Sequence, residues 1–408
     1  MVDVADLQRG LLSVVRERGG AKAESVAEAL LAVPRHVFVP DVSVDEAYRD
    51  EAIVTERDAQ GVPMSSSSQP TIMALMLDQL DVASGQRVLE IGTGSGYNAG
   101  LLAQLVGPAG MVVSVEIDPR VAARAGSILS AAGCSQVRVV CADGADGYSP
   151  EAPYDRIIAT VGVWDLAPAW LDQLASDGRL VVPLDLHGAQ VSVAFEREDG
   201  HWASRSLVPC GFMRLRGALA GPEQVVVLDQ TSGLMLSVPD ARDIDRDGVW
   251  AALTDTPVVY ATGVVGDPGV DAFAGLGVWL AVTAPQSCVV SDENRGSAAL
   301  ESALVNTEGF RASWGIVDGA SIALLGRRIV ANASSQLDVH GFGPDGDRLA
   351  VDLVMRVRAW DSAGRTPADR LRVTAYPRNT TANGGGVVLD KVHTRLVVSG
   401  LTSAGAMG

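Results

Sequence analysis

The pattern of apolar and polar positions divides the chain into three parts. Apolar residues recur at helical spacing from about residue 4 to residue 31, and Gly19-Gly20 splits this stretch into two predicted helices. Pro34 and Pro40 then end the helical pattern. We expect the serine-rich stretch Met64–Ser68 to be a loop, followed by a helix with Pro70 in its first turn.

Strands and helices alternate in the second part, up to about Arg216. This alternation implies right-handed crossovers and predicts an α/β fold with a doubly wound, mostly parallel sheet of the Rossmann-like class. A late antiparallel pair is expected after it. The predicted strands are Arg87–Ile91, Met111–Glu116, Val137–Cys141, Tyr154–Thr160 and Leu180–Val182, and the late pair is Val191–Phe195 with Trp202–Val208.

The pattern changes after Arg216 to short strand-like runs separated by Gly, Pro, Asp and Asn, with one helix between Asp345 and Ala359. We therefore predict two domains, residues 1–216 and residues 217–408, the second being an α+β accessory or substrate-recognition domain. The clearest predicted strands of the second domain are Val258–Ala261, Val278–Val282, Leu371–Tyr376 and His393–Val398.

Composition narrows the possible partners. The formal net charge of −17 argues against nucleic acid or an anionic membrane as the main partner. The four cysteines form no CxxC pair, and no His/Cys cluster has metal-ligand spacing, so we predict no metal and a reducing, cytoplasmic location. The start of the chain does not resemble a signal peptide, and no apolar stretch approaches the roughly 18 residues of a membrane span. The sequence does not indicate the oligomeric state.

The segment Val88–Tyr97 carries the main chemical signal. Its apolar residues predict a buried parallel strand, and its glycines let the backbone approach a ligand at the strand's carboxyl end. A dinucleotide would also use an acid such as Glu116 after the second strand, to bind ribose hydroxyls. It would need neither Glu90, which can receive an amino group, nor Asp143-Gly144, where an adenine amine can be held.

These acids together favour S-adenosylmethionine, with S-adenosylhomocysteine as product. The alternative is that both glutamates are solvated strand ends and that the glycines only form a tight turn. The predicted cofactor-binding residues are Glu90, Gly92, Thr93, Gly94, Ser95, Gly96, Tyr97, Glu116, Ile117, Asp143, Gly144 and Thr160.

With these residues in place, the chain resembles the protein-L-isoaspartate O-methyltransferases over residues 5–216. The Ser-Gln-Pro segment is specific to that family among methyltransferases. The matching segments, in order, are Val33–Pro40, Tyr48 with Asp50–Ile53, Ser66–Met73, the glycine turn, Glu116, Asp143-Gly144, Pro153–Ile157, Gly178–Pro183 and Val208-Pro209.

The resemblance implies methyl transfer to a carboxylate oxygen by in-line displacement. A carboxylate with a pKa of about 4 is already an anion at neutral pH, so the enzyme needs orientation and partial desolvation rather than a strong base. Hydroxyl groups suit that task, and the resemblance makes Ser68 the first candidate, with Ser67 and Ser66 beside it. The alternative is a polar loop that only caps the following helix.

Two features depart from the repair enzymes of the family. The chain continues for about 190 residues after the late strand, and Val161–Trp164 replaces a small Ala/Pro-rich segment. The segments His340–Pro344 and Asp390–Val398 resemble those of an extended subset encoded with ribosomally made peptides such as lanthipeptides and graspetides.

That subset implies an L-Asp acceptor in a constrained, modified precursor peptide, whose ester yields an aspartimide or isoaspartate. Two alternatives remain open. The first is a protein-L-isoaspartate O-methyltransferase that repairs damaged proteins. The second is a non-catalytic peptide-binding module.

Overall fold

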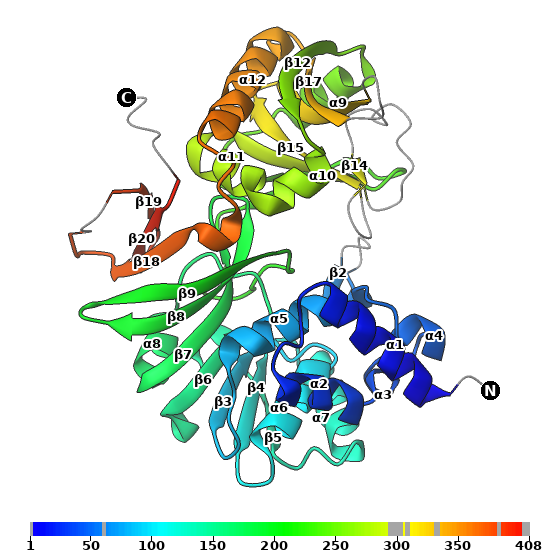
Figure 1. Cartoon of the computed structure of the whole chain (residues 1–408), viewed down its shortest axis with the longest axis vertical. Coiled ribbons are helices and arrows are strands. Elements are labelled where there is room, and N and C mark those ends of the chain that lie inside the picture. Colours follow the sequence, from blue (N-terminus) through cyan, green and yellow to red (C-terminus); the bar gives the residue numbers. More distant parts are fainter. Residues whose placement is uncertain are drawn as a thin grey trace.

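Two β-sheets organise the chain, one in each half of Figure 1. The computed structural model describes residues 3–58, 63–292, 305–306, 311–329, 335–381 and 385–401. Among these residues, no helix combines the length and hydropathy that a membrane crossing requires.

The first sheet has ten strands in the order β19-β20-β18-β9-β8-β7-β6-β3-β4-β5. The pairs β5-β4, β4-β3, β3-β6 and β6-β7 are parallel, and the remaining pairs are antiparallel. The predicted doubly wound sheet with a late antiparallel pair is confirmed. Its strands are β3 (Arg87–Ile91), β4 (Met111–Glu116), β5 (Val137–Cys141), β6 (Tyr154–Ala159), β7 (Leu174–Asp185), β8 (Gln190–Glu198), β9 (His201–Cys210), β18 (Arg372–Pro377), β19 (Val387–Asp390) and β20 (Thr394–Ser399).

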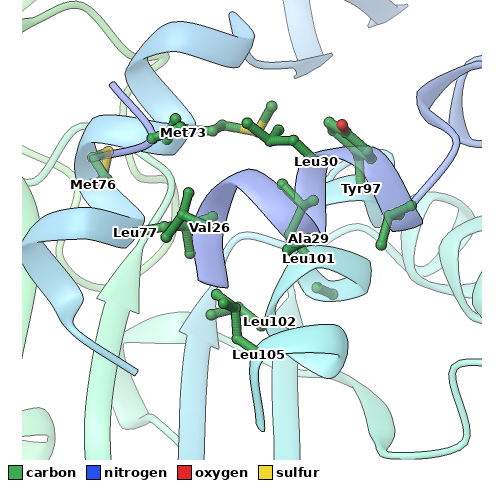
Figure 2. Packing of buried hydrophobic residues seen from close by; sticks show 14 of the residues in the cluster. Val26, Ala29, Leu30, Met73, Met76, Leu77, Tyr97, Leu101, Leu102 and Leu105 are labelled. Carbon is green, nitrogen blue, oxygen red and sulfur yellow. The ribbon is translucent and has the colours of Figure 1, made fainter. Parts of the chain in front are cut away.

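Helices from the N-terminal part pack against this sheet. Figure 2 shows apolar side chains of α2, α5 and α6 meeting in one buried cluster, including Val26, Leu77 and Leu101. This packing fixes α5 and α6, whose first residues follow the serine-rich stretch and the glycine turn. The helices are α1 (Val4–Glu17), α2 (Glu24–Ala32), α3 (Arg35–Phe38), α4 (Val44–Ala47), α5 (Pro70–Leu80), α6 (Tyr97–Val106), α7 (Pro119–Ala131) and α8 (Pro168–Gln173).

The second sheet has the order β10-β11-β13-β15-β16-β17-β12, with β14 paired to β15. Helix α12 packs on it through Leu349, Leu353 and Val357. The elements are β10 (Gln224–Asp229), β11 (Leu234–Val238), α9 (Arg246–Thr254), β12 (Val258–Val265), α10 (Pro268–Asp271), α11 (Gly277–Thr283), β13 (Ser287–Asp292), β14 (Val305–Asn306), β15 (Arg311–Asp318), β16 (Ser321–Ile329), β17 (Ser335–Phe342) and α12 (Gly346–Ser362).

The strand predicted at Val278–Val282 is wrong, because this segment lies inside helix α11. Residues 277–281 are all buried. A short apolar run that is buried on every side has no periodicity to distinguish a helix from a strand.

The last strands return to the first sheet. Strand β18 pairs with β9 through Thr374 with Ala203 and Ala375 with Trp202, and β20 and β19 follow outward from it (Figure 1). A division of the chain at residue 216 therefore stays a proposal for residues 224–362. Strands β18, β19 and β20 are part of the first sheet.

Candidate active site

A cavity of about 1110 Å³ lies at the carboxyl ends of β3 and β4. Its volume is above the roughly 300–1,000 Å³ that a single small ligand occupies, so it has room for a second reactant. Its walls include the glycine turn, the serine-rich stretch before α5, residues 209–216, and α10 with its following turn.

The glycine turn (Gly92–Gly96) has the geometry of a ligand cradle. Gly92 and Gly94 have φ of +97° and +53°. A Cβ at Gly92 would lie 2.9 Å from Val161 Cγ1, and one at Gly94 would lie 3.1 Å from the Ser66 carbonyl oxygen. Glycine is therefore required here both by backbone conformation and by close approach. The second contact also shows that the serine-rich stretch lies directly over the turn.

Glu90 lies behind the turn and does not line the cavity. It is fully buried, and its carboxyl group accepts hydrogen bonds from Asn98 Nδ2 (2.8 Å) and Ser114 Oγ (2.5 Å). Burial raises the pKa of Glu90 to about 7, against the opposing effect of these two donors. Asn98 does line the cavity and connects it to Glu90. The sequence analysis missed this residue, although its place in the first turn of the following helix was a usable signal.

Glu116 lies on the cavity wall, as predicted for a ribose-binding carboxylate. Its oxygens accept the N–H groups of Gly94 and Asp118, both at 3.1 Å, so the carboxylate is fixed in position. The role of Asp143 in holding the adenine stays a prediction. Asp143 accepts the N–H groups of Ala145 (2.9 Å) and Ala218 (2.8 Å) and is not on the cavity wall.

Most of the predicted site residues line the cavity, and three do not. Glu90, Gly96 and Asp143 stand behind the wall, and Gly96 packs near Leu129. The predicted residues that line the cavity are Ser66, Ser67, Ser68, Gly92, Thr93, Gly94, Ser95, Tyr97, Glu116, Ile117, Gly144 and Thr160. Their roles in binding and catalysis remain predictions.

The serine-rich stretch was expected to be a loop, but most of it forms strand β2 (Pro63–Ser67), paired with β1 (Ile53–Arg57). The pairing of Ile53 with Ser67 and Val54 with Ser66 fixes which serine faces which way. Ser67 is buried, and its hydroxyl has no hydrogen-bond partner among the described residues. A buried hydroxyl without a partner is costly unless a ligand uses it.

Arg35 and Asp50 hold the serine-rich stretch and the start of α5 in position. Neither residue had a role predicted from the sequence. Arg35 is fully buried and donates to the carbonyl oxygens of Ser68 (3.1 Å) and Ser67 (3.5 Å). It also donates to three carbonyl oxygens in the segment before β1. Asp50 accepts from the Thr71 N–H (2.8 Å) and from Gln69 Nε2 (3.1 Å).

Comparison with known proteins places this geometry in a family. Residues 7–219 match the family described as protein-L-isoaspartate(D-aspartate) O-methyltransferase. The chain belongs to this family. The protein-L-isoaspartate O-methyltransferase of Methanopyrus kandleri is 39% identical over 209 residues, which are 51% of this chain and 90% of that protein. The protein-L-isoaspartate O-methyltransferase of Methanoculleus marisnigri is 42% identical over 186 residues, which are 46% of this chain and 80% of that protein.

The likeness in fold extends further than the family match. A solved structure named protein-L-isoaspartate O-methyltransferase has a TM-score of 0.50 and 22% identity, covering 90% of this chain and 96% of its own. That coverage reaches beyond residue 219 into the C-terminal region.

The protein is thus an S-adenosylmethionine-dependent methyltransferase. The residues present fit the cofactor. The glycine turn provides the close backbone approach, and Glu116 provides a fixed carboxylate on the wall. When bound, the cofactor supplies an electrophilic methyl group.

Arg214 and Arg216 line the same cavity but are already paired. Arg214 Nη1 contacts Asp185 (2.6 Å) and Glu223 (3.3 Å), and Arg216 lies 3.7 Å from Glu116. Their pairing reduces the attraction between either guanidinium and an incoming carboxylate.

Proposed function

We propose that the protein methylates the side-chain carboxylate of an Asp residue in a ribosomally made, macrocyclic peptide. The observation that supports it best is the position of the serine-rich stretch over the glycine turn, in a cavity with room for an acceptor beside the cofactor. The substrate class rests on the resemblance of the C-terminal segments to the extended subset.

In this proposal the protein binds and orients the acceptor carboxylate. The carboxylate is an anion at neutral pH, so no residue has to remove a proton from it. Ser68 and Ser67 offer hydroxyl donors on the cavity wall, and the Ser67 hydroxyl is not used elsewhere among the described residues. Arg35 acts as a positioning residue, because its guanidinium holds the backbone of both serines.

The methyl ester then reacts further within the peptide. The amide nitrogen of the next residue attacks the ester carbonyl carbon, a C–N bond forms, and methanol leaves with the amide proton. The product is an aspartimide, which persists or is hydrolysed to Asp or isoaspartate. These steps need no further residue of the enzyme.

One of the two C-terminal segments that carry the resemblance, Asp390–Val398, packs against the residues that follow β6. Lys391 is buried, donates to the Asp185 carbonyl oxygen (3.1 Å) and lies 4.7 Å from the ring centre of Trp164. Asp165 accepts from the His393 N–H and from Thr394 Oγ1, both at 2.6 Å. The segment Val161–Trp164, which differs from that of the repair enzymes, and the segment Asp390–Val398 thus meet in one interface. We infer that this interface fixes the last strands of the first sheet beside the segment Val161–Asp165.

A second candidate function is the repair of isoaspartyl residues in damaged proteins. It is favoured by the family match and by the named relatives, which are protein-L-isoaspartate O-methyltransferases. The non-catalytic alternative is not supported, because the chain belongs to an enzyme family and keeps the glycine turn.

Mass spectrometry separates the two enzymatic functions. The full chain is incubated with S-adenosylmethionine and a cyclised peptide in an Asp form and an isoAsp form. The proposal expects the Asp form to gain one methyl group and then to lose methanol. Methylation of the isoAsp form alone would establish the repair function instead.

A further inference from the structure

The second domain contributes to the cavity wall. Asp267, Gly269, Val270 and Phe273 line the cavity together with the glycine turn and the serine-rich stretch. Val270 lies in α10, and Phe273 lies in the turn Ala272–Leu276 that follows it. These residues are 68% and 36% exposed, so part of the apolar surface of each faces the open volume.

The position of both side chains is fixed by the fold. The Phe273 ring packs edge-on against Trp314 of β15, with ring centres 5.3 Å apart. Asp267 caps α10 by accepting the N–H groups of Gly269 (2.9 Å) and Val270 (3.3 Å).

The rest of the cavity wall indicates what occupies this region. Phe212 and Met213, after β9, add apolar surface from the first domain, and Arg214 and Arg216 add paired cationic groups. The cofactor is accounted for by the glycine turn and Glu116. A molecule that reaches from the serine-rich stretch to Val270 therefore has an anionic group and an apolar group close together. A peptide with an acidic residue beside an apolar residue has this chemistry.

We propose that Val270 and Phe273 form an apolar subsite that binds an apolar side chain of the acceptor peptide next to the methylated residue. The inference rests on the proposed function only in that the acceptor is a peptide carboxylate. It holds equally for an Asp or an isoAsp acceptor. It gives the second domain a specificity role in the first domain's reaction.

Binding of labelled peptides to the full chain saturated with S-adenosylhomocysteine tests this subsite. The probes are four fluorescein-labelled hexapeptides, with Asp or isoAsp at the acceptor position and Leu or Ser directly after it. Fluorescence anisotropy gives each Kd without requiring turnover. We expect the Leu probe to bind about tenfold more tightly than the Ser probe for the preferred acceptor.

The variants Val270→Ser and Phe273→Ala should remove this preference and leave cofactor affinity, measured by calorimetry, unchanged. Val265→Ser is the matched control, because Val265 is an exposed valine of the same domain (55% exposed) and does not line the cavity. Val270 is exposed enough that Val270→Ser should fold normally even if Phe273→Ala does not.

Equal or unmeasurable binding of the Leu and Ser probes by the wild-type chain would overturn the proposed subsite. So would a preference that survives in Val270→Ser. A chain that prefers isoAsp probes, yet loses the Leu preference in the variants, would overturn the proposed Asp acceptor and support the subsite.

Discussion

The buried carboxyl group of Glu90 should make the stability of the first domain depend on pH. Its pKa rises from an ordinary value of 4.5 to about 7, because burial disfavours the charged form. The protonated carboxyl group favours the folded state. This stabilisation is fully present below the pKa of Glu90 in the unfolded chain, and it is lost as the pH rises through the pKa of Glu90 in the folded chain. The free energy of unfolding should therefore fall between about pH 4.5 and somewhat above pH 7.

The shift corresponds to about 3 kcal/mol in total, since one pKa unit is about 1.4 kcal/mol. About 2 kcal/mol of it lies between pH 5.5 and pH 8.5, a range that avoids the isoelectric point near 4.7. Glu90→Gln removes the ionisation while an amide oxygen can still accept from Asn98 or Ser114. The drop in stability over this range should then be smaller in the variant by about 2 kcal/mol.

Urea denaturation followed by circular dichroism at both pH values measures this difference. Glu28→Gln is the control, because Glu28 is an exposed glutamate on α2 and should leave the pH dependence unchanged. The other titrating groups are common to all three proteins and cancel in the comparison. If Glu90→Gln lost as much stability as the wild type from pH 5.5 to pH 8.5, burial would not be controlling this carboxyl group.

Three further predictions concern the cavity. Gly92→Ala should weaken S-adenosylmethionine binding at least tenfold in calorimetry, because its Cβ would meet Val161. The control Gly85→Ala has a similar φ of +85° and open space around it, so it should leave the affinity unchanged, and equal affinities of the two variants would refute a role of the glycine turn in cofactor binding. Ser68→Ala should lower kcat/KM for peptide methylation roughly 100-fold with cofactor affinity unchanged, and an unaffected rate would leave Ser68 as a structural residue only. Arg214→Ala should raise the peptide KM about tenfold without changing cofactor affinity, with partial recovery in Arg214→Lys; no change in KM would remove Arg214 from acceptor binding.

The first domain was largely predictable because its signals are local. Periodicity identifies the helices and strands, and the glycine turn identifies the ligand end of β3, since both depend on residues close in sequence. The same local reasoning failed where burial removes periodicity, as in α11. It also failed at strand β2, whose serines are extended because they pair with β1 rather than because of their own propensity.

The sequence by itself determined the doubly wound fold and the cofactor class, because both follow from short segments that can each be interpreted separately, and its resemblance to the family implied a carboxylate acceptor. Only the tertiary structure decided how these parts act together. Arg35 contacts the serine-rich stretch and Asp50 contacts the start of α5, although each pair is separated by 15 or more residues of chain. Strand β18 joins β9 over a separation of about 170 residues, and Phe273 of the second domain reaches the cavity of the first. Such contacts depend on how elements pack after they form, and short-range patterns carry no record of them.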